Sequence, residues 1–294
     1  SAASVAVGMV SAALGTQVIG STIRPASYCG VIGFKPTVGA LNRGGSHDYF
    51  SQSCTGVLAT TLEDTWQVAY EIASRAGGDP GFPGLFGPDR PPAPEKPRRI
   101  AFLETAGWAV ASDTAKQAFE TALSRLSAAG IAILDRRSDP KIAALETAIA
   151  NARMLSARIN EWEARWPLNT YRERDEEKLS VAMRERLKRA EAMRLDDYRA
   201  LLKERNSARA CYADLAAVCD GCVTLSAPGP APVGLDATGN PAFAVPASLL
   251  GIPAVSLPVL QDEGLPLGLQ ILGFEHRDDA MFSLARWVTS CVRA

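Results

Sequence analysis

Residues Gly15 to Gly39 read GTQVIGSTIRPASYCGVIGFKPTVG, and this stretch decides how the rest of the chain is interpreted. Glycine or proline interrupts it every few residues, which excludes a regular helix. Its apolar side chains require burial, which excludes a solvated linker. Buried loops of this kind often aim free N–H groups at a ligand or a transition state. Ser21 follows Gly20 at the sharpest part of the loop and is the first candidate nucleophile; the alternative is a packing loop with an ordinary buried hydroxyl.

The composition is that of a globular protein. The chain has 294 residues, of which 47% are hydrophobic and 21% charged, enough for one large domain or two small ones. A net charge of −1 gives no electrostatic argument for binding nucleic acid or an anionic membrane. No apolar run approaches the roughly 20 residues that span a bilayer. The opening SAASVAVGMVSAAL lacks the basic region of a signal peptide.

Six cysteines are scattered along the chain, which favours free thiols in a reducing, cytoplasmic compartment. Cys219-Asp-Gly-Cys222 has the C-x-x-C spacing of a redox pair or half of a metal site. No second pair supplies further metal ligands, and the apolar run after Cys222 indicates a strand. We therefore interpret the two cysteines as structural and expect no metal.

Strands and helices are expected to alternate over much of the sequence. Small residues on every face of residues 2–14 predict a buried helix that ends at Gly15. Residues 77–97 are rich in Gly and Pro and predict an irregular connection. Strands alternating with helices indicate an α/β fold, a sheet covered by helices. The expected strands are 31–34, 99–103, 131–134, 223–225, 254–257 and 267–272, and the expected helices are 61–75, 113–129 and 278–292.

Residues 141–218 have a different texture, being long, charged and almost free of Gly and Pro. Basic runs here raise the alternative of an RNA-binding face, but acidic residues are interleaved throughout. The pattern favours solvated helix faces with i,i+4 charge pairs. We expect a helical excursion over the sheet that walls the substrate entrance.

Several motifs, in order along the chain, resemble the amidase signature family, with the malonamidase-like members as the nearest pattern. The resemblance implies a single α/β/α sandwich domain with a mixed central sheet over residues 1–294. It is carried by SAASVAVGMV at 1–10, ALGTQ at 13–17, GSTIRPASYCG at 20–30, GFKPTVG at 33–39, SAPGPAP at 226–232, LGIPAVSLP at 250–258 and GLPLGLQILG at 264–273.

Amide hydrolysis needs a nucleophile, a proton shuttle and stabilisation of an oxyanion. A Ser-His-acid triad would have to use His47 or His276, the two histidines of the chain. His47 lies in a polar loop and is the better candidate, whereas His276 is expected at the surface. G-x-S-x-G is absent around Ser21, so a triad is weakly supported.

The resemblance implies a Ser–cis-Ser–Lys arrangement instead, with Ser21 as the nucleophile. A buried, neutral lysine acts as the base, because desolvation lowers the pKa of an ammonium group. The second serine and this lysine fall upstream of Ser1, so the chain is expected to lack the N-terminal part of the domain. Lys35 matches a downstream Lys-Pro position and is expected to anchor a loop. The oxyanion hole is expected from the backbone N–H groups of Gln17, Val18, Ile19 and Gly20.

Val18 and Ile19 stand where the family has Thr-Gly or Gly-Gly. Backbone donors do not depend on side-chain identity, so the oxyanion hole is compatible with this change. If residue 19 required a positive φ, the β-branched Ile19 would be strained by about 1–3 kcal/mol.

Arg24 follows Ser21 by three residues, which resembles the S-x-I-R-P-A variant whose Arg holds a substrate carboxylate. A guanidinium binds a carboxylate with two parallel hydrogen bonds, and a buried one needs such an anion. The alternative is an internal salt bridge to an Asp or Glu of the same chain.

The function predicted on this basis is hydrolysis of a small amide through an acyl-enzyme on Ser21, with an amide that carries a carboxylate as the expected preferred substrate. No cofactor is implied. One alternative is an amidotransferase-type subunit that passes ammonia to a partner's substrate. Another is a catalytically inactive or truncated relative that acts as a binding module. A homodimer is left open.

Overall fold

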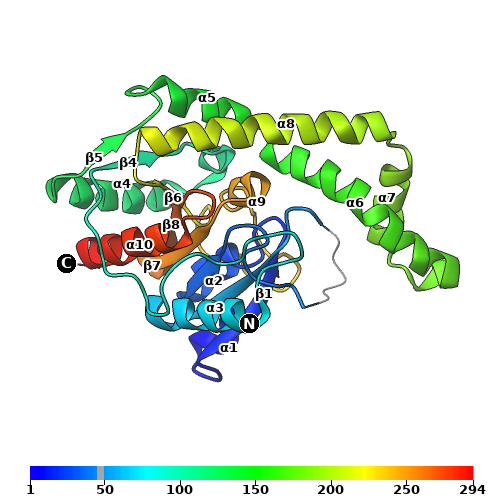
Figure 1. Ribbon diagram of the computed structural model, residues 1–294, viewed down its shortest axis with the longest axis horizontal. Helices are drawn as coiled ribbons and strands as arrows, with labels where there is room; N and C mark the ends of the chain where they lie inside the picture. Colours follow the sequence, from blue (N-terminus) through cyan, green and yellow to red (C-terminus); the bar gives the residue numbers. More distant parts are fainter. Residues whose placement is uncertain (45–49, 294) are drawn as a thin grey trace.

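The computed structural model describes residues 1–44 and 50–293, and His47 lies outside them (Figure 1). Its centre is an eight-stranded mixed sheet in the order β1-β3-β2-β7-β8-β6-β4-β5. The strands are β1 (Ala12–Gln17), β2 (Ile32–Lys35), β3 (Cys54–Ala59), β4 (Arg99–Phe102), β5 (Ala132–Leu134), β6 (Cys222–Leu225), β7 (Ala254–Asp262) and β8 (Leu265–Leu272). The α-helices are α1 (Ala2–Ala6), α2 (Ile23–Cys29), α3 (Leu62–Ala76), α4 (Asp113–Ala128), α5 (Pro140–Ile149), α6 (Ala152–Asp175), α7 (Val181–Glu191), α8 (Leu195–Ala213), α9 (Val245–Leu250) and α10 (Asp278–Arg293), with short 3₁₀ helices η1 (Ala106–Val110), η2 (Glu176–Lys178) and η3 (Asp214–Ala217).

The sheet changes character across its width. From β1 to β6 every neighbouring pair is antiparallel, whereas β4 pairs in parallel with both β5 and β6. The unit β4–α4–β5 is the parallel strand-helix-strand arrangement that the sequence predicted. A parallel pair needs such a crossover because its second strand must start again at the same end.

Two hydrophobic clusters divide the helices between the faces of the sheet. One packs α3, α4 and α10 against the sheet through Trp66, Phe119 and Phe282. The other contains Ile23 of α2 and Leu249 of α9, together with residues of α5, α6 and α8. Helices on both faces of a mixed sheet confirm the predicted α/β/α architecture.

The first segment differs from the prediction of one buried helix over residues 2–14. The helix ends at Ala6, Gly8 adopts φ +74°, and Ala12–Gln17 form an edge strand paired with β3. Small residues are compatible with either state, so the pairing with β3 decides the conformation. As an edge strand β1 is open on one side, and Leu14 keeps 52% of its surface exposed.

Other element ends follow their local signals. Thr61 caps α3 by accepting a hydrogen bond from the amide of Asp64, and Ser112 caps α4 by accepting one from Ala115. The Gly- and Pro-rich segment between α3 and β4 contains no helix or strand, as predicted. The strand predicted over 254–257 continues five residues further, to Asp262. The remaining predicted strands and helices are found to within about two residues, the usual uncertainty of such boundaries.

The predicted helical segment is present as α5 to α8, and α6 and α7 project away from the sheet (Figure 1). The ion pairs of this segment have spacings other than the predicted i,i+4. Within α7 and α8 the pairs are spaced i,i+3, as in Lys188–Glu185. Between α6 and α7, Arg189 contacts Glu161 and Arg172 contacts Glu191. Most of these side chains are exposed, so they contribute little to stability.

Candidate active site

Ser21 stands on a sharp turn between β1 and α2. Gly20 before it has φ +144°, a conformation that favours glycine. A Cβ atom at Gly20 would lie 3.0 Å from the Cβ of Ala244 and 3.1 Å from that of Pro241, so the loop is pressed against another segment. Ser21 itself is exposed, and no described residue makes a hydrogen bond with its hydroxyl. The alternative of an ordinary buried hydroxyl is therefore wrong.

The side chain of Gln17 holds this turn in place. Its Oε1 accepts hydrogen bonds from the amides of Thr22 and Ile23, each at 3.0 Å, and its Nε2 donates to Ser248 Oγ at 3.1 Å. The Gln17 side chain is fully buried. It therefore satisfies the first amides of α2 and fixes where Ser21 leaves the strand.

We expect Gln17→Leu to reduce the free energy of unfolding by about 2 kcal/mol, because it leaves buried donors without an acceptor. Urea unfolding measures this loss, and hydrogen exchange should show faster exchange of the Thr22 and Ile23 amides. Thr16→Val, at the exposed neighbouring position, is the matched control and should change neither. Unchanged exchange at Thr22 and Ile23 would contradict the capping role.

The backbone next to Ser21 carries unused donors. Among residues 1–44 and 50–293, none accepts a hydrogen bond from the amides of Val18, Ile19, Gly20 or Ser21. The carbonyl of Val18, by contrast, accepts a bond from Gln52 Nε2 at 3.0 Å. Of the four residues predicted for the oxyanion hole, three thus have free amides. Gln17 lies in the β1–β3 ladder opposite Cys54 and contributes its side chain.

Ile19 does not adopt the positive φ that would have strained its β-branched side chain. Among the described residues other than glycine, only Glu263 and His276 have a positive φ. The left-handed conformation falls on Gly20, where it costs little. Ile19 instead packs its side chain against the cluster around α2 and α9.

Arg24 lies on the first turn of α2, and its amide donates to the carbonyl of Gly20 at 3.1 Å. Its Nε is buried without a hydrogen-bond partner, and no described carboxylate forms an ion pair with its guanidinium. Burial lowers the pKa of Arg24; the hydroxyl of Tyr28 opposes this, and the neighbouring guanidinium of Arg153 acts in the same direction as burial. The described part of the chain therefore offers Arg24 no internal salt bridge.

The segment 239–244, ahead of α9, forms the opposite wall and was missed by the sequence analysis. A Cβ at Gly239 would lie 2.2 Å from the hydroxyl of Tyr28. Burial raises the pKa of Tyr28, and the backbone amide of Asn240 opposes this effect. Asn240 Oδ1 also accepts a bond from Arg153 Nη1 of α6 at 3.4 Å. The Asn-Pro pair at 240–241 marks a turn, but nothing local indicates its contact with Ser21's loop.

Two other candidate side chains lie outside this arrangement. Lys35 is fully buried, and its Nζ donates to the carbonyl of Pro36 at 2.7 Å and to Cys54 Sγ at 3.4 Å. It anchors the end of β2, as the sequence predicted. His276 is half-buried rather than exposed, with its ring against Phe86 and its Nδ1 without a partner.

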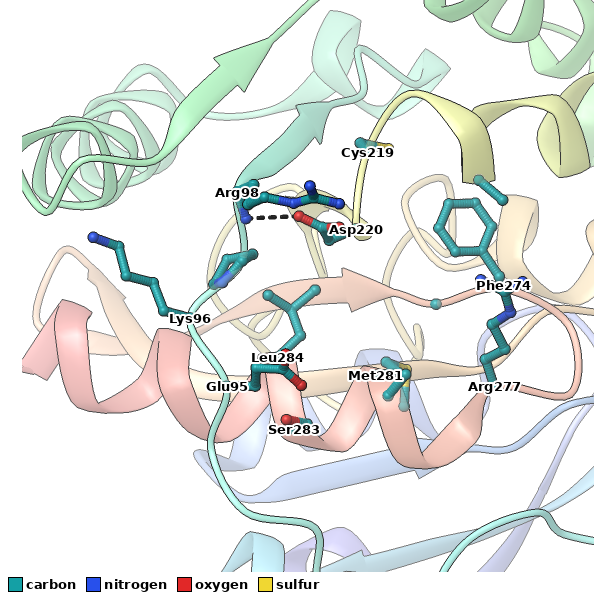
Figure 2. Close-up of a pocket in the computed structure, with 14 residues that line it drawn as sticks. Glu95, Lys96, Arg98, Cys219, Asp220, Phe274, Arg277, Met281, Ser283 and Leu284 are labelled. Carbon is teal, nitrogen blue, oxygen red and sulfur yellow. Dashed lines mark hydrogen bonds between the residues drawn. The ribbon is translucent and has the colours of Figure 1, made fainter.

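Two of the hollows among the described residues have similar volumes. One, of about 540 Å³, is an open groove lined by Tyr28 and Asn240 together with residues of 109–112 and 228–232. The other, also of about 540 Å³, lies between the segment leading into β4, the loop before β6 and the start of α10 (Figure 2). None of the site residues predicted from the sequence lines this second cavity. Ser21, Arg24 and residues 17–20 do not line the groove beside Tyr28 either, and that groove adjoins the wall formed by Gly239 and Asn240.

No helix among the described residues is long and apolar enough to cross a bilayer. The same residues contain no group of three or more His, Cys, Asp or Glu side chains placed to hold a metal ion.

Comparison with known proteins agrees with this fold. The model of the amidase family matches residues 1–282. The chain is 30% identical to a glutamyl-tRNA(Gln) amidotransferase subunit from Exiguobacterium sibiricum, over 95% of this chain and 64% of that protein. Among solved structures, one described as an amidase superimposes with a TM-score of 0.79 at 25% identity, over 99% of this chain and 65% of the other. The peptide amidase of Stenotrophomonas maltophilia gives a TM-score of 0.74 at 24% identity, over 100% and 65%.

The chain belongs to the amidase family. It spans about two thirds of the length of these relatives, 64% and 65% for the first two. At 24% identity, the likeness to the peptide amidase concerns the fold alone.

Proposed function

We propose that the protein hydrolyses small amides through an acyl-enzyme on Ser21. The Ser21 oxygen attacks the amide carbon, the C–N bond breaks, and ammonia or an amine leaves with the proton taken from the hydroxyl. Water then cleaves the ester and restores the serine. The observation that carries this proposal is the exposed hydroxyl of Ser21, which no described residue binds, beside a run of amides that have no acceptor among the described residues.

The oxyanion formed in each step would be stabilised by the amides of Val18, Ile19, Gly20 and Ser21. Fixed backbone donors are effective because they need no reorganisation as charge develops. Two side chains support this loop, Gln17 through the α2 amides and Gln52 through the Val18 carbonyl. Activity is measured on the native polypeptide.

We assign a carboxylate-bearing amide as the preferred substrate. Arg24 has no ion-pair partner in the described chain, and a partly buried guanidinium binds a carboxylate strongly. Arg153 lies close enough to lower the pKa of Arg24, which adds positive charge to the same region. Because Arg153 belongs to α6, the helical segment 141–218 would form one wall of the substrate entrance.

The test has two parts. The native polypeptide is labelled with a fluorophosphonate, and the labelled peptide is mapped. Ammonia release is then measured with malonamate, an aliphatic amide and an aryl amide. Label on Ser21 and ammonia release support an amidase. Label on another residue contradicts the assignment of the nucleophile, and a stable fold without label or turnover favours a binding module.

A second candidate is an amidotransferase-type subunit, which the 30% identity to a glutamyl-tRNA(Gln) amidotransferase subunit favours. Such a protein would label at Ser21 but release ammonia efficiently only with a partner chain. Co-purification from the native source distinguishes the two candidates. The free state of all six cysteines is compatible with a reducing, cytoplasmic location.

A further inference from the structure

Cys219 and Cys222 lie together at the start of β6, away from the residues assigned to amide hydrolysis. Cys222 is the first residue of β6, and Cys219 sits on the loop that leads into it from η3. Both are free thiols in the structure. Gly221 keeps the loop close to α10, since a Cβ there would lie 2.5 Å from Leu284 Cδ2.

The two thiols differ in their access to small molecules. Cys222 is fully buried, whereas Cys219 is 5% exposed and lines the cavity ahead of β4. Figure 2 shows Cys219 at the edge of this cavity, near Arg98 and Asp220. A small oxidant in the cavity therefore meets Cys219 first.

The surroundings of Cys219 favour its thiolate. Its thiol donates a hydrogen bond to the carbonyl of Leu215 at 3.6 Å. The interaction with the thiol of Cys222, together with the nearby amides of Gly221 and Ala101, lowers the pKa of Cys219 against the opposing effects of burial and of the Asp220 carboxylate. Burial raises the pKa of Cys222. An accessible thiolate next to a buried, protonated thiol is the usual division between an attacking and a resolving cysteine.

The charges around the cavity are mixed, because Glu95 and Asp220 line it as well, and the Asp220 carboxylate raises the pKa of Cys219. Lys96, Arg98 and Arg277 line it, all three side chains are exposed, and none forms an ion pair with a described residue. The opposing carboxylate of Asp220 is engaged, because it accepts hydrogen bonds from the amides of Arg98 at 2.7 Å and Arg99 at 3.0 Å. Three basic and two acidic side chains give the lining a small excess of positive charge, the setting in which reactive cysteines are found.

We propose that Cys219 and Cys222 form a redox-active dithiol that peroxides oxidise to a disulfide. The Cys219 thiolate attacks one oxygen of hydrogen peroxide, the O–O bond breaks, and a sulfenic acid and water form. The Cys222 sulfur then attacks the Cys219 sulfur, and the hydroxyl leaves as a second water. In balance, two thiols lose two electrons and two protons, and one peroxide becomes two waters. This assignment is independent of the proposed amidase function.

The experiment follows individual cysteines by mass spectrometry. The native polypeptide is treated with hydrogen peroxide, quenched with acid, unfolded in urea, alkylated and digested. We expect Cys219 and Cys222 to lose alkylation together, with a loss of two hydrogens, and to regain it after treatment with dithiothreitol. Cys219 should react about tenfold faster than the half-buried Cys211, because its thiolate is stabilised.

Variants separate the two steps. In Cys222→Ser the reaction should stop at a sulfenic acid on Cys219, which dimedone traps, and in Cys219→Ser Cys222 should stay alkylatable. Cys211→Ser is the matched control and should form the disulfide normally. The oxidation rates of Cys219 and Cys211 in the wild-type protein test the proposal even if a variant folds poorly. Oxidation of Cys219 no faster than that of Cys211, or without loss of Cys222 alkylation, would overturn the proposal.

Discussion

Ser21→Ala is expected to lower ammonia release by the native polypeptide about 10⁴-fold or more and to abolish fluorophosphonate labelling. The exposed hydroxyl of Ser21 is the atom that would form the acyl bond, and removing a catalytic serine costs a serine hydrolase a loss of this order or larger. The fold should be retained, because the side chain makes no hydrogen bond with a described residue. Steady-state ammonia release and intact-mass detection of the label measure the two effects.

Ser11→Ala is the matched control, since Ser11 is an equally exposed serine just before β1. This variant should react with the fluorophosphonate and release ammonia like the unmodified protein. Because the variants differ by the same single oxygen, general destabilisation is controlled. Undiminished labelling of Ser21→Ala would show that another nucleophile reacts and would remove the basis of the proposed mechanism.

The fold could largely be predicted because most element ends carry local chemical signals. Ser112 and the Gly- and Pro-rich segment after α3 fix boundaries through interactions within a few residues. Residues 2–14 carry no such signal, since Ala, Ser and Val are compatible with a helix and with a strand. The decision is made by β3, about forty residues away, whose Cys54–Ala59 pairs with β1. A single-sequence pattern does not contain that contact.

Some features of the candidate site can likewise be predicted from the local sequence, whereas others depend on distant contacts. The turn at Gly20 and the positions of Ser21 and Arg24 follow from local sequence, and the family resemblance gives them roles. The contacts that hold the turn are distant: Gln17 bonds to Ser248, and the wall around Asn240 comes from the far end of the chain. Glutamine is most often a solvated residue, so its buried capping role shows only in three dimensions.

Arg24→Gln is expected to reduce kcat/KM for malonamate about 10²–10³-fold, the effect of removing one partner of a close, partly buried charge pair. The loss should fall on substrates with a carboxylate, because the unpaired Arg24 guanidinium has no other described anion to bind. For propionamide, which lacks the carboxylate, kcat/KM should fall less than about threefold. Steady-state kinetics with the two amides measure the selectivity directly.

Arg158→Gln is the matched control, because Arg158 is an exposed arginine of α6 with no described ion pair. This substitution should leave kcat/KM unchanged for both malonamate and propionamide. Arg24→Lys keeps the charge but loses the two-pronged geometry, so it should recover part of the malonamate activity. An equal loss on malonamate and propionamide would mean that Arg24 supports the fold of α2 and binds no substrate carboxylate. Labelling at Ser21 would survive that outcome, so the nucleophile and the substrate class are tested separately.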